Sequence, residues 1–289
     1  MRAIVTIGRV LLLAAAVGLT AVPTVKADEA EVHYRLALSH KRSGKLAQAI
    51  NEARLAIKLR PDHAAAHFTL GSLYRRIGNL TGARAACEKV IELSPGNPDG
   101  YAMCGGVLIR LKLYEQAVEN LRKAVVLDPD DTTSAANLGL ALRKAGRKEE
   151  AIQVLIDVAR RRPDDTKLLN NLGVALRRER RYSEAVKYLK QAVERKPDDI
   201  KLNMNLAITL RGAERWKEAV PHYRKVLKSR PNNIGALYDL ASCYEKLGRT
   251  DEAVEAYTRY VKVVRSSDKE AAERGEGRIK MLEQEAALQ

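Results

Sequence analysis

The most regular candidate for chemistry in this sequence is a column of three asparagines. They stand 34 residues apart, at Asn137, Asn171 and Asn205. Each lies inside a run of apolar residues, where asparagine is costly because its amide must find a hydrogen-bond partner. A side-chain amide carries both a donor and an acceptor, so it can pair with a peptide group whatever side chain that residue has. The column therefore predicts a surface that holds peptide backbone.

Two basic columns and one aliphatic column follow the asparagines with the same spacing. The basic side chains stand six or seven residues further on, which is about two helical turns along nearly the same face. They are Arg143, Lys144, Arg177, Arg178 and Arg211. The aliphatic column between them is Leu140, Val174 and Ile208. An amide lane, an aliphatic lane and a cationic lane would together suit an extended segment that carries carboxylates and some apolar side chains.

Two plainer interpretations of these columns stay open. Duplicated copies can share a residue only because they are recent, although the position before the asparagines has already changed to Ala136, Asn170 and Met204. The cations can also be ordinary solvated side chains, because positive charge is favoured at the C-terminal end of any helix.

Little else in the sequence predicts a reactive centre. His63 and His67 are four residues apart, but no third ligand accompanies them. His33, His40 and His67 fall at helix-packing positions, so we expect no metal site and no cofactor. The sequence contains no Gly-rich phosphate loop, nucleophile elbow or arranged carboxylate pair, and the repeats described below leave no room for a catalytic domain. We expect a protein that is not an enzyme.

The three cysteines are Cys87, Cys104 and Cys243. An odd number without C-x-x-C spacing excludes a disulfide framework and a zinc signature. Cys87 and Cys104 fall in core columns of adjacent repeats and could meet. Two interpretations stay open for them, a disulfide in an oxidising compartment and a pair of small buried side chains.

The elements that must position these residues follow from a 34-residue period. Proline occurs at 61, 95, 129, 163, 197 and 231, and alanine at 49, 83, 117, 151, 185, 219 and 253. Each repeat contains two helical patterns. In residues 166–199, Leu169, Leu172, Gly173 and Leu176 share one face of the first helix. Gly173 allows close approach of the second helix, proline ends the repeat, and an aspartate after it can cap the next helix.

These features resemble the tetratricopeptide repeat family. The matching residues are the Leu-Gly or Leu-Ala pair of the first helix, the tyrosine or leucine beyond it, the alanine of the second helix and the closing proline. The resemblance covers residues 30–267 as seven repeats, which start at Ala30, Ala64, Pro98, Thr132, Thr166, Ile200 and Ile234. It implies an all-α fold, a right-handed α-solenoid of helix-turn-helix repeats. Residues 268–289 are expected to form a C-terminal capping helix, because repeat arrays need a polar end.

The family resemblance also suggests a place for the asparagines. In this family the stripe of the first helix that carries them lines the concave inner surface. The asparagine column is similar to the ladder in the repeat domain of O-linked N-acetylglucosamine transferase, which holds the backbone of an extended peptide. The resemblance therefore implies a peptide-binding groove made by repeats four to six.

Residues 1–27 are predicted to be a secretory signal peptide. Arg2 and Arg9 precede the apolar run from Val10 to Val22, and small residues precede a cleavage position after Ala27. The alternative is an uncleaved anchor in the inner membrane that faces the periplasm, although the run is short for a full span of about 20 residues. The whole chain has a formal charge of +15, and residues 1–27 hold three basic and no acidic residues, which leaves 15 − 3 = +12 after cleavage.

We therefore expect an exported scaffold, located in the periplasm, that holds an extended or acidic segment of another protein. It would help to assemble a complex of the cell envelope. The alternative function is electrostatic binding of a non-protein polyanion, such as acidic polysaccharide or lipopolysaccharide, which depends on the net charge alone. Nucleic acid is not an expected partner, because export separates the protein from most of it. Occupation of the groove by another copy of the chain, a self-association, stays open.

Overall fold

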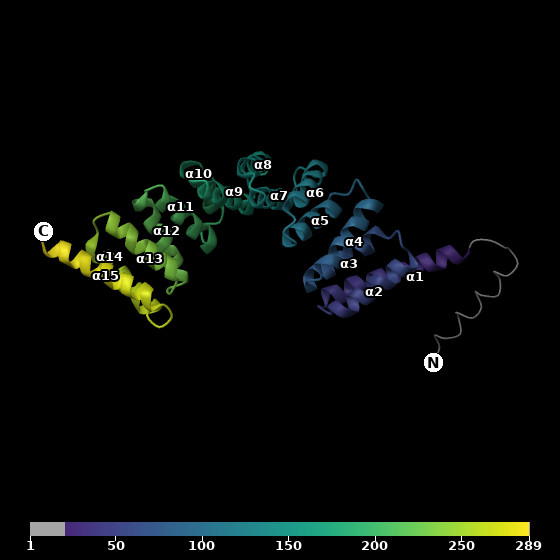
Figure 1. Cartoon of the computed structure of the whole chain (residues 1–289), viewed down its shortest axis with the longest axis horizontal. Helices are drawn as coiled ribbons and strands as arrows, with labels where there is room; N and C mark the ends of the chain where they lie inside the picture. Colours follow the sequence, from purple (N-terminus) through teal and green to yellow (C-terminus); the bar gives the residue numbers. More distant parts are fainter. Residues whose placement is uncertain (1–20, 289) are drawn as a thin grey trace. The chain divides into compact units, whose positions relative to one another are not determined.

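The computed structural model describes residues 21–288, and side-chain burial from residue 29 onward. These residues form fifteen α-helices and no strand, which confirms the predicted all-α repeat fold (Figure 1). The chain divides into two compact parts, Met1–Leu127 and Asp128–Gln289, called here the N-terminal part and the C-terminal part. Each part is described by itself.

The described residues of the N-terminal part form six helices. They are α1 (Ala21–Arg42), α2 (Leu46–Leu59), α3 (Ala64–Ile77), α4 (Leu80–Leu93), α5 (Pro98–Arg110) and α6 (Tyr114–Leu127). Most of residues 1–27 lie outside the described residues. Helix α1 begins at Ala21 and continues past the predicted cleavage position, so the signal peptide stays a prediction. Among the described residues, no helix is both long enough and apolar enough to cross a membrane.

The C-terminal part contains nine helices in its described residues. They are α7 (Thr132–Lys144), α8 (Lys148–Arg161), α9 (Thr166–Arg178), α10 (Tyr182–Arg195), α11 (Ile200–Gly212), α12 (Trp216–Ser229), α13 (Ile234–Lys246), α14 (Thr250–Val264) and α15 (Lys269–Ala287). Each helix packs against the next one in the chain, and α9 also contacts both α7 and α11. The first helices of successive repeats therefore lie side by side.

Aspartates cap the first helices of repeats four to six. Asp165 accepts hydrogen bonds from the backbone N–H groups of Lys167 and Leu168, and Asp131 and Asp199 do the same for α7 and α11. These bonds satisfy donors that would otherwise lack a partner at the start of a helix. The last aspartate of each of these Pro-Asp-Asp sequences therefore caps the helix that follows it.

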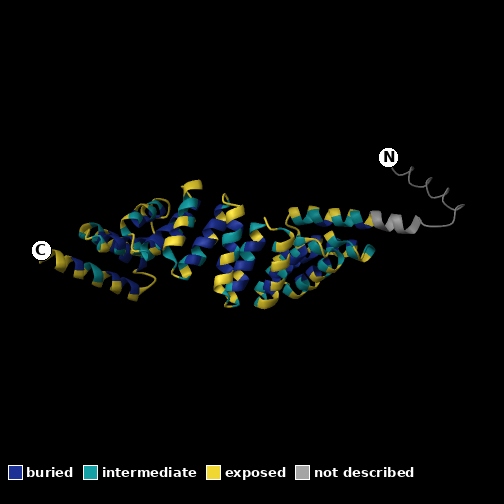
Figure 2. Ribbon diagram, turned by 90° about the horizontal axis from the view of Figure 1, so that it is seen from above, coloured by how far each residue is buried: buried dark blue, intermediate teal, exposed yellow. Residues whose placement is uncertain are grey.

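Close packing inside each hairpin depends on small residues. Leu172 is fully buried and Gly173 lies against Leu189 of the second helix. A Cβ atom built on Gly173 would lie 2.5 Å from Cγ of Leu189, which is too close for any side chain. The buried residues lie on the helix faces that turn toward neighbouring helices (Figure 2).

A disulfide joins Cys87 of α4 to Cys104 of α5 in the N-terminal part. The two cysteines are 17 residues apart and come from successive repeats. Both side chains are buried, at 0% and 2% exposure. The structure therefore favours the first of the two interpretations of this pair. Cys243 is a free buried thiol in the C-terminal part.

Helix α15 packs on α14 at the end of the chain. Ala271, Ala272, Gly275 and Leu282 form its buried side. A Cβ atom on Gly275 would lie 2.6 Å from Cγ2 of Val261, so this glycine allows the close contact. The helix continues through both of its glycines without a break.

Candidate functional site

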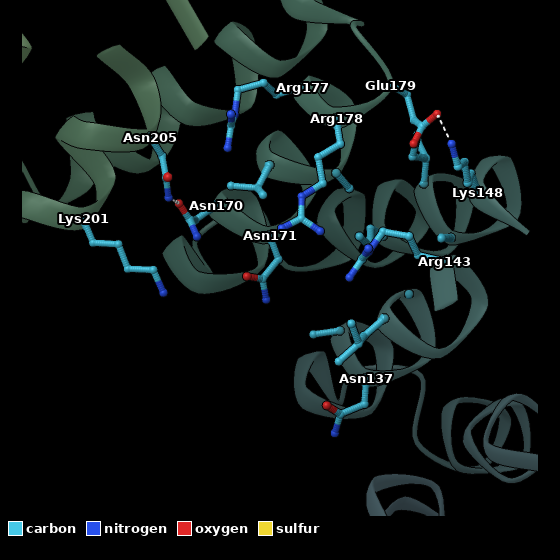
Figure 3. A pocket seen from close by; sticks show the side chains of 18 residues that line it. Asn137, Arg143, Lys148, Asn170, Asn171, Arg177, Arg178, Glu179, Lys201 and Asn205 are labelled. Atoms are coloured by element: carbon cyan, nitrogen blue, oxygen red, sulfur yellow. Dashed lines mark hydrogen bonds and ion pairs between the residues drawn. The ribbon is translucent and has the colours of Figure 1, made fainter. Parts of the chain in front are cut away.

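A groove in the C-terminal part is lined by the first helices of repeats four to six. Its volume is about 450 Å³, and its walls come from α7, α8, α9 and the first turns of α11 (Figure 3). The helices position the site because α9 contacts both α7 and α11, which places equivalent residues of three repeats on one surface.

Eight of the eleven predicted site residues line this groove. They are Asn137, Leu140, Arg143, Asn171, Val174, Arg177, Arg178 and Asn205. The structure therefore brings together all three asparagines, two of the three aliphatic residues and three of the five cations. Their role in binding stays a prediction.

The other three predicted residues lie outside the groove lining. Lys144 is exposed at the end of α7. Ile208 is partly buried and packs against the hydrophobic core of the C-terminal part. The third residue, Arg211, forms an ion pair with Asp239 of α13, with 3.3 Å between Nε and Oδ1.

The Arg211 ion pair belongs to a buried polar cluster. The Tyr223 hydroxyl donates to the second carboxylate oxygen of Asp239, at 3.0 Å. Burial raises the pKa of Asp239, while the nearby Arg211 charge and the Tyr223 bond oppose that rise. Asp239 occupies in repeat seven the position that is asparagine in repeats four to six. In repeat seven the asparagine position is thus occupied by a carboxylate, Asp239, which pairs with Arg211 of repeat six.

The three groove asparagines are in different situations. Asn171 is exposed and Asn137 is half-buried, and among residues 21–288 neither side chain has a hydrogen-bond partner. The Asn205 amide instead donates to Oδ1 of Asn170, at 2.6 Å. Asn137 and Asn171 therefore have amides available for a ligand, whereas Asn205 shares its amide with a neighbouring repeat (Figure 3).

Asn170 is a groove residue that the sequence analysis did not select. It lies in the changing column beside the asparagines, and its side chain is only 5% exposed. A buried amide in a helix needs a hydrogen-bond partner, and this requirement is the only feature of the sequence that could have drawn attention to Asn170. The 34-residue spacing does not reveal that the partner is Asn205 of the next repeat.

Charged residues of the groove were also missed. Lys201 lines it from the first turn of α11, and Lys148 and Glu179 line its other end. Lys148 Nζ lies 3.2 Å from Oε2 of Glu179. The groove lining thus contains five cations, Arg143, Lys148, Arg177, Arg178 and Lys201, and one carboxylate, which leaves 5 − 1 = +4.

Within the described residues, no group of three or more His, Cys, Asp or Glu side chains could hold a metal ion. His63 and His67, which are four residues apart in the sequence, make separate contacts. His63 lies 3.5 Å from Glu31, and His67 bonds to the carbonyl oxygen of Pro61. What the groove can offer is hydrogen bonding, a small apolar floor and positive charge.

Two family models match the chain. The model described as the cilia and flagella-associated protein 70 C-terminal domain, a tetratricopeptide repeat model, matches residues 12–236, or 225 of the 289 residues. The tetratricopeptide repeat model matches residues 210–272. A comparison with curated protein sequences found no significant match.

Several solved structures are similar in fold. The C-terminal part of a tetratricopeptide repeat protein from Cytophaga hutchinsonii has a TM-score of 0.68 and 18% identity, covering 84% of this chain and 98% of that one. Pseudomonas aeruginosa PilF has a TM-score of 0.60 and 20% identity, covering 71% and 94%. YrrB, described as a tetratricopeptide repeat protein with an unusual peptide-binding site, has a TM-score of 0.51 and 23% identity, covering 63% and 96%.

At these identities the solved structures establish the fold alone. The family model covers more than half of the chain, and the repeated helix pairs of the structure agree with it. The chain therefore belongs to the tetratricopeptide repeat family.

Proposed function

We propose that this protein is a non-enzymatic scaffold that holds an extended segment of a partner protein in the groove between α7, α9 and α11. The observation that carries the proposal is the pair of amides at Asn137 and Asn171, which face the groove without a hydrogen-bond partner in the described part of the chain. Such amides can pair with the backbone of a bound segment. The peptide-binding site named for the similar protein YrrB supports the proposal by analogy.

The charge of the groove indicates what the segment carries. Arg143, Arg177, Arg178 and Lys201 have no ion pair within residues 21–288, so an acidic segment would be attracted to them. Leu140 and Val174 offer apolar contacts beside them. The proposed ligand is therefore an extended, acidic segment with some apolar side chains.

We further propose that the protein is exported and acts in a cell-envelope complex, with the periplasm as its location. The basic and apolar N-terminal sequence supports export. The buried disulfide between Cys87 and Cys104 supports it independently, because disulfides persist in oxidising compartments and are rare in the cytosol.

A pull-down from envelope extract with paired variants tests the scaffold function. The groove variant changes Asn137 and Asn171 to alanine, and leaves Asn205 in place because it also holds Asn170. The matched control changes Asn51 and Asn120, which lie outside the groove lining and outside the cationic hollows described below. We expect one protein to be retained by wild type and control and lost by the groove variant. Retention of the same proteins by all three baits would contradict a peptide site at the asparagines.

The segment of the retained partner can then be tested as a labelled synthetic peptide. Each amide that pairs with the peptide backbone contributes about 1 kcal/mol. Loss of two such amides should therefore weaken binding by about tenfold or more, measured as fluorescence anisotropy.

A second candidate function, polyanion binding, is supported by a separate cationic surface in the C-terminal part. Two hollows of about 430 Å³ and 470 Å³ on α12 to α14 both include Arg259 in their lining. The other cations of their lining are Arg224, Lys228, Lys262 and Arg249, and Arg249 pairs with Glu252. Glu255 is the remaining carboxylate of the lining. Arg224, Lys228, Arg259 and Lys262 have no ion pair among the described residues. An anionic polymer could therefore bind along this surface.

Binding of lipopolysaccharide or polygalacturonate at rising salt concentration tests the second candidate. If this surface binds a polyanion, changing the four cations to glutamine should abolish a strongly salt-dependent affinity. The Asn137 and Asn171 variant should bind as wild type does. Equal affinity of the four-glutamine variant and wild type would contradict polyanion binding at this surface.

A further inference from the structure

Three successive loops of the C-terminal part carry a carboxylate that pairs with a cation of the following repeat. In each case the first aspartate of a Pro-Asp-Asp sequence meets a basic side chain from the second helix of the next repeat. The nitrogen–oxygen distances are 3.8 Å for Arg161 and Asp130, 2.9 Å for Arg195 and Asp164, and 2.8 Å for Lys225 and Asp198. The charges of loop and helix therefore neutralise each other at these three places.

The next loop, between α12 and α13, lacks this carboxylate. It reads Pro-Asn-Asn at residues 231–233, so Asn232 occupies the position of Asp198, 34 residues earlier. Asn233 caps α13 by accepting a hydrogen bond from the backbone N–H of Ala236, at 2.9 Å. The cap of the helix is thus kept, while the position that pairs with a cation in the earlier loops holds a neutral amide instead of a charge.

The cations that correspond to this position are retained. In repeat six, the hydrogen bond from Lys225 and the charges of Lys225 and Lys228 lower the pKa of Asp198. Arg259 and Lys262 of α14 occupy the equivalent positions in repeat seven. Neither has an ion pair among residues 21–288. Repeat seven therefore has the two cations of repeat six without the anion between repeats.

The two cations and the loop amide line one hollow. Its volume is about 470 Å³, and its described lining residues, Pro231, Asn232, Leu237, Arg259, Lys262 and Val263, include no carboxylate. Arg259 and Lys262 are three residues apart on α14, so their side chains share one side of the helix. Unpaired cations such as Arg224 also occur nearby. What distinguishes this hollow is that the corresponding place in the three preceding loops holds an anion.

We propose that Asn232, Arg259 and Lys262 form a binding site for a phosphate monoester group, which takes the place of the loop carboxylate. Such a group carries a charge of about −1.5 to −2 at pH 7 and matches two cations, whereas a carboxylate would neutralise one of them. The guanidinium of Arg259 can bind two phosphate oxygens through parallel hydrogen bonds, and the amide of Asn232 supplies a further donor. The carrier of the phosphate, a phosphorylated glycan, rests on the second candidate function, and the site itself does not.

Two opposite substitutions test the site. Asn232→Asp restores the loop carboxylate, and Asp198→Asn removes it from the preceding loop, which leaves Lys225 and Lys228 unneutralised. Asn51→Asp on α2 is the control, because it adds the same charge in the N-terminal part. All three positions are exposed, and circular dichroism checks that each variant keeps its helices.

The probe is radiolabelled glucose 6-phosphate, measured by equilibrium dialysis at a constant ionic strength that is set with chloride. At saturation we expect wild type and Asn51→Asp to bind equal amounts, Asn232→Asp to bind one molecule fewer per chain, and Asp198→Asn to bind one more. Phosphate held by other cations of the chain is the same in all four proteins and cancels in these differences. Equal binding by Asn232→Asp and Asn51→Asp would overturn the site.

Glucuronate provides a comparison of the two anionic groups on the same sugar, because it carries a carboxylate where glucose 6-phosphate carries its phosphate ester. We expect glucuronate to compete for the Asn232-dependent molecule of glucose 6-phosphate at least fivefold less effectively than unlabelled glucose 6-phosphate does. Equal competition by the two sugars would overturn the preference for a doubly charged group.

Lipopolysaccharide before and after removal of its phosphate groups separates this inference from the second candidate function. We expect wild type to bind the phosphorylated form more tightly, and Asn232→Asp to lose that preference. If the four-glutamine variant loses lipopolysaccharide but neither dephosphorylation nor Asn232→Asp changes binding, the polyanion surface stands and the phosphate site is overturned. If glucose 6-phosphate depends on Asn232 but the four-glutamine variant binds lipopolysaccharide as wild type does, the phosphate site stands and polyanion binding at this surface is overturned.

Discussion

At the scale of single residues, asparagines at the same position of their repeats differ in their hydrogen bonding. Asn137 and Asn171 present amides to the groove, while Asn205 donates to Asn170 of the preceding repeat. The same column reaches Asp239 in repeat seven, where a carboxylate neutralises Arg211. Residues at the same position of each repeat therefore lie on the same surface. Whether each of them is free to bind a ligand depends on the side chains of the neighbouring repeat.

We predict different stability costs for two alanine substitutions in this column. Asn205→Ala removes the donor to the buried Oδ1 of Asn170, which should lower the unfolding free energy by about 1–2 kcal/mol. Asn171→Ala should change it by less than about 0.5 kcal/mol, because the side chain is exposed and makes no bond in the described structure. Urea unfolding followed by Trp216 fluorescence measures both, since the chain has one tryptophan and it lies in the C-terminal part. Equal costs would mean that the Asn170–Asn205 bond does not stabilise the fold.

At the scale of helices, the hairpins depend on close approach at one small residue. We predict that Gly173→Ala destabilises the C-terminal part by about 1–3 kcal/mol, because the added Cβ would meet Leu189 at 2.5 Å. Gly277→Ala on α15 is the matched control, since its Cβ would meet nothing within 4 Å. That change should stabilise the helix by about 0.5–1 kcal/mol. Urea midpoints of the two variants should therefore move in opposite directions from wild type.

Ion pairs also connect the second helices of successive repeats. Glu218 of α12 binds both Arg215, the residue just before this helix, at 2.6 Å, and Lys190 of α10, at 2.8 Å. The bonds from Arg215 and Lys190 lower the pKa of Glu218 from 4.5 to about 2. The stabilisation from this carboxylate is therefore present above pH 4.5 and is lost as the pH falls from 4.5 toward 2.

We predict that Glu218→Gln is less stable than wild type at pH 7 by about 1 kcal/mol or less, because the Glu218 side chain is 43% exposed and water screens the pairs. The difference should shrink below pH 4.5 and vanish near pH 2. Unfolding free energies measured across this range check the sign. A difference that stays constant down to pH 2 would show that the glutamine acts through packing and not through charge.

At the scale of the whole molecule, both compact parts have a hydrophobic core, and the N-terminal part also contains a disulfide. The core of the N-terminal part includes residues from Ala37 to Val107, and the core of the C-terminal part extends from Val186 to Leu282. The disulfide joins α4 to α5. Because the N-terminal part has no tryptophan, Trp216 reports the C-terminal part alone, while circular dichroism reports the helices of both.

We predict that loss of the disulfide destabilises the N-terminal part by about 3 kcal/mol, the amount expected for a cross-link that closes a loop of about 17 residues. Wild type unfolded in the presence and absence of a thiol reductant is compared with a Cys87→Ala, Cys104→Ala variant. The circular dichroism transition should begin at lower denaturant in the reduced chain and in the variant, and the Trp216 transition should move much less. Unchanged circular dichroism in both would contradict a stabilising cross-link.

Much of the fold was predictable because its causes are local. Proline and aspartate mark the ends of each repeat, leucines spaced for one helix face mark the core, and Gly173 marks a close contact with the second helix. Eight of the eleven predicted site residues line one groove for the same reason, since equivalent positions of stacked repeats must share a face.

The sequence by itself thus determined the helices, their pairing and the face on which the candidate site lies. Only the tertiary structure decided which polar groups of that face are available to a ligand. Asn170 bonds Asn205, Lys148 binds Glu179 and Arg211 binds Asp239, in each case between neighbouring repeats. The period places equivalent residues side by side but does not specify how far each helix is rotated or which long side chain reaches a partner 28 to 35 residues away. That choice depends on packing between repeats, and it leaves Asn137, Asn171 and the three groove arginines without partners in the described chain.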